Sequence, residues 1–168
     1  MRTIRWMSLL AIAAAGCTKS TSAEDDWTYI LSVAPWIRTM VDHCDAYKST
    51  KNRAEKIDLF NQAINSLTTV TVKNTQGEVV ELMPIGSPDD PDQYALIVKV
   101  RDRVNFMSQS KERSIPRGGD IYLAASKLKA DQCVIFSGEK IAAAGSYELG
   151  KLCDTRYYMN FTALAPCL

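Results

Sequence analysis

Five cysteines constrain how this chain of 168 residues folds more strongly than any other feature of its sequence. One follows an apolar N-terminal segment, and four lie further along the chain, at Cys44, Cys133, Cys153 and Cys167. The four are 89, 20 and 14 residues apart, so they form no Cys-x-x-Cys pair, and the single histidine further argues against zinc. An even number of cysteines in an exported chain predicts two disulfides, with all three pairings open. The alternative is four buried free thiols.

The first 16 residues have the composition of a bacterial signal peptide. Two arginines lie among the first five residues, and no acidic residue precedes Glu24. The segment Trp6–Ala15 is apolar except for one serine. It is too short to cross a bilayer, which takes roughly 20 residues, and has the length of a signal-peptide core. The segment therefore predicts export.

The end of this segment, Ala14-Ala15-Gly16-Cys17, resembles a lipobox, although a lipobox usually has leucine where this chain has Ala14. The resemblance implies that the thiol of Cys17 receives a diacylglycerol thioether and that Cys17 becomes the first residue of the mature protein. The residue after Cys17 is Thr18 and not aspartate. In this the chain resembles lipoproteins that are sent on to the outer membrane. The alternative is ordinary cleavage after Ala23, which would leave a soluble periplasmic protein.

Loss of residues 1–16 removes two arginines and no acidic residue, which changes the formal net charge from +1 to −1. A nearly neutral domain has no overall field that attracts polyanions, and this argues against non-specific nucleic-acid binding. The mature length of about 150 residues fits one domain with a core of its own.

Two helices are expected at the start of this domain, after a polar tether at residues 17–25. Apolar residues recur every three or four positions from Trp27 to Cys44, as on one face of a helix. Pro35 lies within this stripe, where it either kinks one helix or begins a second. A further helix is predicted near Ala54–Ser66, and residues 26–67 form the helical part of a single domain at 26–168.

Residues 68–168 are expected to form five strands with one short helix. Strands are predicted at 69–73, 78–83, 94–104, 133–138 and 157–161, with a turn at 74–77 and a helix at 121–128 that Asp120 caps. A helix between the third and fourth of five strands is the order of an OB-fold barrel. The predicted fold is therefore α+β, with an N-terminal helical pair followed by an OB-like, five-stranded antiparallel barrel.

The passage from this helix into the fourth strand resembles small exported bacterial OB-fold-like domains. Those domains have the pattern L-K-x-G-x-x-V-x-F-S-G, and this chain has Leu128-Lys129-Ala130-Asp131-Gln132-Cys133-Val134-Ile135-Phe136-Ser137-Gly138. The resemblance covers Thr68 to Leu164 and departs from the pattern near Asp131, where the turn commonly has glycine. It implies a barrel in which Gly138 lets the fourth strand bend, and it carries no information about the ligand.

Three segments have residues of the kinds that carry chemistry. His43, beside Asp42, could serve a hydrolase as a base, but no partners follow from spacing, and a helix-surface histidine is the favoured interpretation. Asp89, Asp90 and Asp92 lack the order of a calcium loop, so a solvated loop is favoured. The segment 114–119 has two adjacent glycines and an arginine but no phosphate-binding pattern.

The most basic stretch, residues 99–117, offers a candidate binding face. Lys99, Arg101 and Arg103 are expected on one side of the third strand, with Tyr94 and Phe106 as aromatic neighbours. Basic and stacking groups of this kind bind single-stranded nucleic acid on OB-folds. The favoured alternative is a solvated outer face. The same stretch contains further basic residues at Lys111, Arg113 and Arg117.

These observations favour a non-enzymatic binding protein without cofactor or metal, anchored in the bacterial envelope through the lipid on Cys17. It is expected in the outer membrane, facing the periplasm. The expected partner is another protein, as for an inhibitor, an immunity protein or an assembly accessory. The alternatives are a single-strand nucleic-acid-binding OB-fold and an envelope hydrolase that uses His43.

Overall fold

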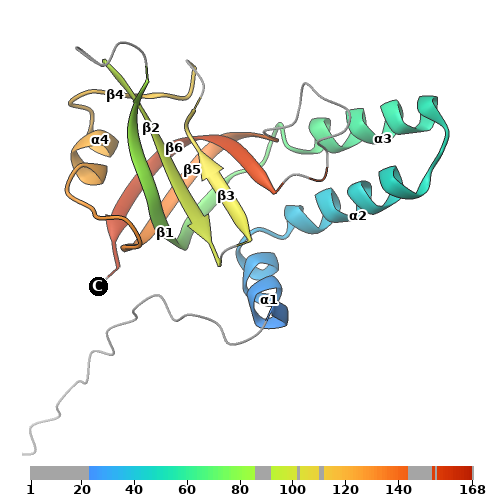
Figure 1. Cartoon of the computed structure of the whole chain (residues 1–168), viewed down its shortest axis with the longest axis horizontal. Helices are drawn as coiled ribbons and strands as arrows, with labels where there is room; N and C mark the ends of the chain where they lie inside the picture. Colours follow the sequence, from blue (N-terminus) through green and yellow to red (C-terminus); the bar gives the residue numbers. More distant parts are fainter. Residues whose placement is uncertain are drawn as a thin grey trace, which may run out of the picture.

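The computed structural model describes residues 23–85, 92–101, 103–109, 112–143, 153 and 155–167. The predicted signal peptide, Cys17, and Asp89 and Asp90 of the acidic loop lie outside these residues. Three helices lead into a barrel, as Figure 1 shows, and a fourth short helix lies against it. The elements are α1 (Ala23–Val33), α2 (Trp36–Ser49), α3 (Arg53–Ser66), β1 (Val72–Ile85), β2 (Gln93–Val100), β3 (Val104–Met107), β4 (Ile115–Pro116), α4 (Asp120–Ala125), β5 (Cys133–Ala143) and β6 (Arg156–Pro166).

The expected helical pair consists of three helices, because the stripe from Trp27 to Cys44 is interrupted at Pro35. α1 ends at Val33, and Pro35 is the N-cap of α2. Proline has no N–H to donate, so it suits the start of a helix better than its interior. α1 also begins at Ala23, within the segment expected to be a tether. α2 and α3 form a hairpin that extends from one side of the barrel (Figure 1).

Five strands close into a mixed barrel, which confirms the α+β prediction. β1 pairs with both β2 and β5, and β6 lies between β5 and β3, so the ring closes. The expectation of a fully antiparallel barrel is wrong, because β3 and β6 run parallel. The strand order is consistent with an OB-like barrel, and α4 stands between β3 and β5, the third and fourth strands of the barrel. β4 is an additional two-residue strand paired with β2.

The predicted strands before α4 are wrong in two places, although the number of barrel strands is right. Two predicted strands form one strand, and one predicted strand forms two. No turn interrupts the chain at 74–77, and β1 continues from Val72 to Ile85. Gly77 serves a close approach instead, since a Cβ there would lie 2.7 Å from the Val98 side chain and 2.8 Å from the Lys99 carbonyl oxygen. The expected long strand 94–104 is two strands, β2 and β3, joined by a turn in which Arg101 has φ 52°.

Aromatic side chains fill the barrel and join it to the helices. Phe106 and Phe136 are fully buried, with ring centroids 5.4 Å apart. Trp36, at the start of α2, meets Tyr157 of β6 edge-on at 4.9 Å and Phe106 at 6.4 Å. Such edge-to-face pairs are favourable beyond the area they bury. Trp36 thereby anchors the helical hairpin to the barrel.

Two disulfides confirm the prediction from the cysteines and settle their pairing. Cys44 of α2 is bonded to Cys153, which precedes β6, with a Cα–Cα distance of 5.1 Å. Cys133, at the start of β5, is bonded to Cys167, with 5.5 Å between the Cα atoms. The Cys167 amide also donates to the Cys133 carbonyl oxygen. The first bridge ties the helical hairpin to the barrel, and the second fixes the end of β6.

The connection around α4 differs from the prediction at both ends of the helix, which runs from Asp120 to Ala125 and not from 121 to 128, and it agrees with the prediction in the turn before β5. Asp120 is the first helical residue and not the cap, because Gly119 occupies the N-cap position. Asp131, where the resembled turn commonly has glycine, adopts φ 61°, a conformation that glycine reaches without strain. Its amide donates to the Val79 carbonyl oxygen at 2.8 Å. Within the described residues, no helix is long and apolar enough to cross a membrane.

Candidate functional site

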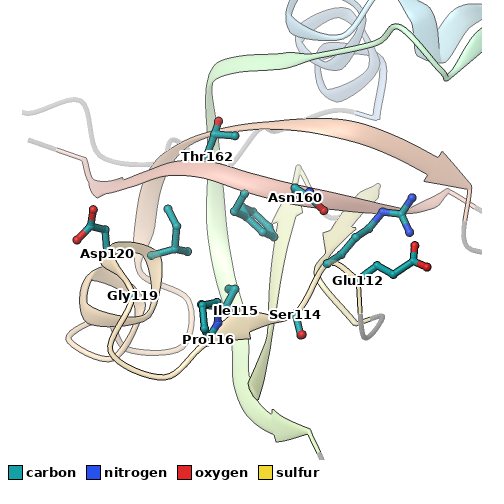
Figure 2. A pocket seen from close by; sticks show the side chains of 11 residues that line it. Glu112, Ser114, Ile115, Pro116, Gly119, Asp120, Asn160 and Thr162 are labelled. Atoms are coloured by element: carbon teal, nitrogen blue, oxygen red, sulfur yellow. The ribbon is translucent and has the colours of Figure 1, made fainter. Parts of the chain in front are cut away.

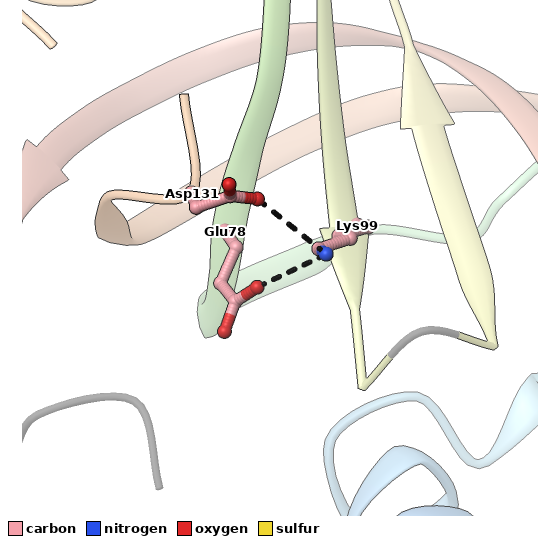
Figure 3. Close-up of polar contacts among 3 residues, drawn as sticks. All are labelled: Glu78, Lys99 and Asp131. Atoms are coloured by element: carbon pink, nitrogen blue, oxygen red, sulfur yellow. Dashed lines mark ion pairs between the residues drawn. The ribbon is translucent and has the colours of Figure 1, made fainter. Parts of the chain in front are cut away.

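The residues of the predicted basic face contact different parts of the fold, and Lys99 contacts two carboxylates. Its ammonium lies 3.3 Å from a Glu78 carboxylate oxygen and 3.7 Å from one of Asp131, as Figure 3 shows. The Lys99 side chain is 24% exposed. These contacts join β1, β2 and the turn before β5, so Lys99 has a structural role in this arrangement.

Arg101 and Arg103 lie in the turn between β2 and β3 and not on a strand face with Lys99. The Arg101 guanidinium lies over the Tyr29 ring, 4.6 Å from its centroid. The Arg103 Nε lies 4.0 Å from an Asp26 carboxylate oxygen. Both contacts are made to α1. The two arginines therefore help to hold α1 against the barrel.

The two aromatic members of the predicted face are also engaged within the fold. Phe106 is 1% exposed and belongs to the barrel core, where a base or other ligand does not reach it. Tyr94 is half-buried and packs against Tyr122 of α4, with ring centroids 4.6 Å apart. The five residues of the predicted face thus do not form one exposed surface.

The other motifs named from the sequence have local contacts. His43 Nδ1 lies 2.7 Å from the Thr39 carbonyl oxygen, one turn earlier on α2. The segment 114–119 forms β4 and a turn, and the Arg117 amide donates to the Asp92 carbonyl oxygen. In the part of the chain that the structure describes, no group of three or more histidine, cysteine, aspartate or glutamate residues is placed to hold a metal ion.

A slot between β4 and β6 interrupts the hydrogen-bonded surface of the barrel. The parallel pairing of β3 with β6 ends at Met107 and Tyr158, whereas β6 continues to Pro166. Beyond this point, β2 pairs with β4 instead, at Tyr94 and Ile115. Among the described strands, β4 and β6 are not paired with each other. Beyond Tyr158, the described part of β6 is therefore paired on one side only, with β5.

A pocket of about 340 Å³ occupies this slot (Figure 2). Its volume is at the small end of the range of ligand pockets, about 300–1,000 Å³. Ile115, Ile121 and Phe161 provide apolar lining. The charged lining consists of two carboxylates, Glu112 and Asp120, and one guanidinium, Arg113. The two labelled carboxylates lie at opposite ends of the pocket (Figure 2).

Asn160 is the pocket residue with the most unusual environment. It lies on β6 and faces the segment that carries Glu112 and Ser114 (Figure 2). Its Oδ1 atom is buried and accepts no hydrogen bond within the described structure. A buried acceptor without a partner costs about 1–3 kcal/mol. Such atoms are rare in folded proteins and call for an explanation.

Neither Asn160 nor the pocket lining at Glu112, Asp120 and Phe161 is predicted from the sequence. One signal was available, because Asn160 is an amide between the apolar residues Met159 and Phe161 of the predicted last strand. Alternation predicts that its side chain points away from those of Met159 and Phe161, so it gives no indication that Asn160 and Phe161 line the same pocket. The slot itself depends on where the β3–β6 pairing ends, and no local pattern marks that point.

Comparisons with known proteins give one match. No protein-family model and no curated protein matches the chain. The chain is similar to a solved chain described as OBody AM3L15 bound to hen egg-white lysozyme, with 16% identity and a TM-score of 0.40. The match covers 65% of this chain and 86% of the solved one.

Proposed function

We propose that the protein is a lipid-anchored component of the bacterial envelope that binds another protein and catalyses no reaction. The lipobox-like sequence at Cys17 and the preceding signal support the anchor. Two disulfides support an oxidising compartment, since such bonds persist in exported proteins and are rare in the cytosol. An inhibitor, an immunity protein or an assembly accessory would work in this way.

The slot between β4 and β6 is the observation that carries the binding proposal. Within the described residues, it combines a strand edge that is not paired with a pocket that has apolar walls, charged groups and a buried acceptor without a partner. Binding sites generally combine an apolar lining with a few converging polar groups. His43 Nδ1 contacts a carbonyl oxygen of its own helix. This contact does not pair His43 with a nucleophile, so it does not support the hydrolase alternative.

The nucleic-acid alternative receives no support from the geometry. It relied on Lys99, Arg101 and Arg103 beside an accessible aromatic ring. Lys99 lies within reach of two carboxylates, the two arginines contact α1, and Phe106 is buried. A titration with single-stranded oligonucleotides at low and high salt tests this alternative, since binding through phosphate contacts weakens steeply with salt.

In-cell cross-linking of a C-terminally tagged chain in its own host, followed by mass spectrometry, tests the proposal. We expect one dominant envelope protein among the cross-linked products. The Cys17→Ser variant is the matched control for the anchor, and we expect it to lose lipid labelling and membrane association. The absence of any protein above background would contradict the binding proposal, and unchanged lipid labelling of the variant would contradict the anchor.

A further inference from the structure

We propose that the pocket between β4 and β6 binds a basic side chain, lysine or arginine, presented by the partner protein. This inference rests on the proposed function and specifies the chemistry of the partner at this site. Three properties of the pocket favour a cation: a buried acceptor, an excess of negative charge and apolar walls.

The buried acceptor is Asn160 Oδ1, which has no hydrogen-bond partner in the described structure. Lysine and arginine side chains carry only donors, three on the ammonium and five on the guanidinium. Asn160 lines the pocket, and a donor from either group would satisfy this oxygen once the amide turns it toward the ligand. Hydrogen bonds that involve a charged group are about twice as strong as those between neutral groups. A ligand that offers only acceptors would leave the oxygen unsatisfied.

The charged lining favours a cation over an anion. Glu112 and Asp120 contribute two carboxylates to the pocket and Arg113 one guanidinium. The Arg113 Nε already donates to the Lys140 carbonyl oxygen at 3.2 Å, which ties this loop to β5. No ion pair of Glu112 occurs within the described residues. We expect a cation that enters from solvent to pair with Glu112 and not with Asp120, which lies at the opposite end of the pocket (Figure 2).

The apolar walls fit the hydrocarbon stem of a basic side chain. Ile115 and Phe161 line the pocket and are 4% and 8% exposed, so they offer firm surfaces within the fold. Lysine and arginine commonly lay their methylene groups along apolar surface while the charged end meets polar groups. The pocket volume of about 340 Å³ fits one such side chain with part of its backbone better than a large cofactor.

A nuclear magnetic resonance titration of the oxidised, detergent-solubilised full chain tests the pocket directly. The probes are the N-acetyl methylamides of lysine, arginine and norleucine, the last of which keeps the stem and lacks the charge. We expect saturable shifts of the amide signals at 112–121 and 160–162 with the two cations and much weaker shifts with norleucine. Equal binding of norleucine, or no shifts at these residues, would overturn the inference.

Variants locate the interaction within the pocket. Asn160→Leu and Glu112→Gln are each expected to weaken cation binding about tenfold, the loss for one charge-assisted hydrogen bond. Asp58→Asn on α3 removes an exposed carboxylate outside the pocket lining and is the matched control. Asn160→Asp keeps the shape of the side chain, adds a charge and is expected to tighten cation binding. A gain in affinity distinguishes a binding role of this residue from a loss of folding in Asn160→Leu. Unchanged affinity in both Asn160→Asp and Glu112→Gln would overturn the inference.

The same variants separate this inference from the proposed function. If the tagged wild-type chain captures a partner and Glu112→Gln captures it equally well, the pocket does not bind the partner and only the further inference fails. If the wild-type chain captures no partner, the proposed function fails, and the titration still decides whether the pocket binds cations.

Discussion

The two disulfides are expected to stabilise the protein unequally. Cys44 and Cys153 are 109 residues apart in sequence, and Cys133 and Cys167 are 34 apart. A bridge lowers the entropy of the unfolded chain more when it closes a longer loop. The loop-entropy relation gives about 4.8 kcal/mol for the first bridge and about 3.8 kcal/mol for the second at 25 °C. Removal of the Cys44–Cys153 bridge should therefore cost about 1 kcal/mol more.

Packing acts in the same direction as loop length. Cys44 is buried at 8% exposure, whereas Cys133 and Cys167 are only half-buried, so alanine at position 44 also loses core contacts. The Cys44–Cys153 bridge in addition joins the helical hairpin to the barrel, and the other bridge acts within the β5–β6 pair. Loss of the Cys44–Cys153 bridge should therefore loosen the helical hairpin before the barrel.

Equilibrium urea unfolding of the two double-alanine variants, followed by circular dichroism and by tryptophan fluorescence, measures these costs. Trp36 reports on the junction between hairpin and barrel, because it packs against Tyr157. The free energy of unfolding should fall further in the variant without Cys44 and Cys153. A larger loss in the variant without Cys133 and Cys167 would refute the loop-entropy reasoning.

Three further substitutions test individual assignments. Phe106→Ala should lower the free energy of unfolding by about 3–5 kcal/mol in a urea titration, because Phe106 is a core residue; a loss below 1 kcal/mol would contradict this placement. Lys99→Met should cost about 1 kcal/mol or less by the same assay, since its ion pairs are partly exposed to solvent, and a loss above 3 kcal/mol would show a stronger network. Cys17→Ser should stop incorporation of radiolabelled palmitate, and continued labelling would contradict lipidation at this residue.

The fold could be predicted from the sequence where a local signal is strong. The turn between α2 and α3 follows from a polar segment that contains the cap Asn52, whose side chain accepts from the Ala54 amide at 2.9 Å. β5 and β6 follow from short apolar runs with alternation. An even number of cysteines predicted two disulfides, although the pairing required the three-dimensional arrangement.

The ends of the strands before α4 could not be predicted, because residue types that favour turns also occur within a strand there. Asn74 to Gly77 has the composition of a turn, but Gly77 is needed here because β2 approaches β1 closely. Conversely, the turn between β2 and β3 contains Arg101 at a positive φ and has no glycine or proline, so Asp102 is its only residue of a type that favours turns. Tertiary contacts override the local preference at both places.

The candidate site was less predictable than the fold. The sequence predicts one continuous strand with basic residues on one side, but the turn at Arg101 distributes these residues to different neighbours. The pocket instead joins residues more than forty positions apart, such as Glu112 and Asn160. Only the way in which β6 continues beyond the end of β3 brings them together.

Site-specific photo-cross-linking in the native host tests the central claim most directly. A photoreactive amino acid at Thr162, an exposed pocket residue on β6, is compared with one at Asp58 on α3. If the protein is a binding module that uses the slot, Thr162 gives one discrete adduct with another envelope protein and Asp58 gives none. Adducts from Asp58 alone, or no adduct from either position, would contradict the account.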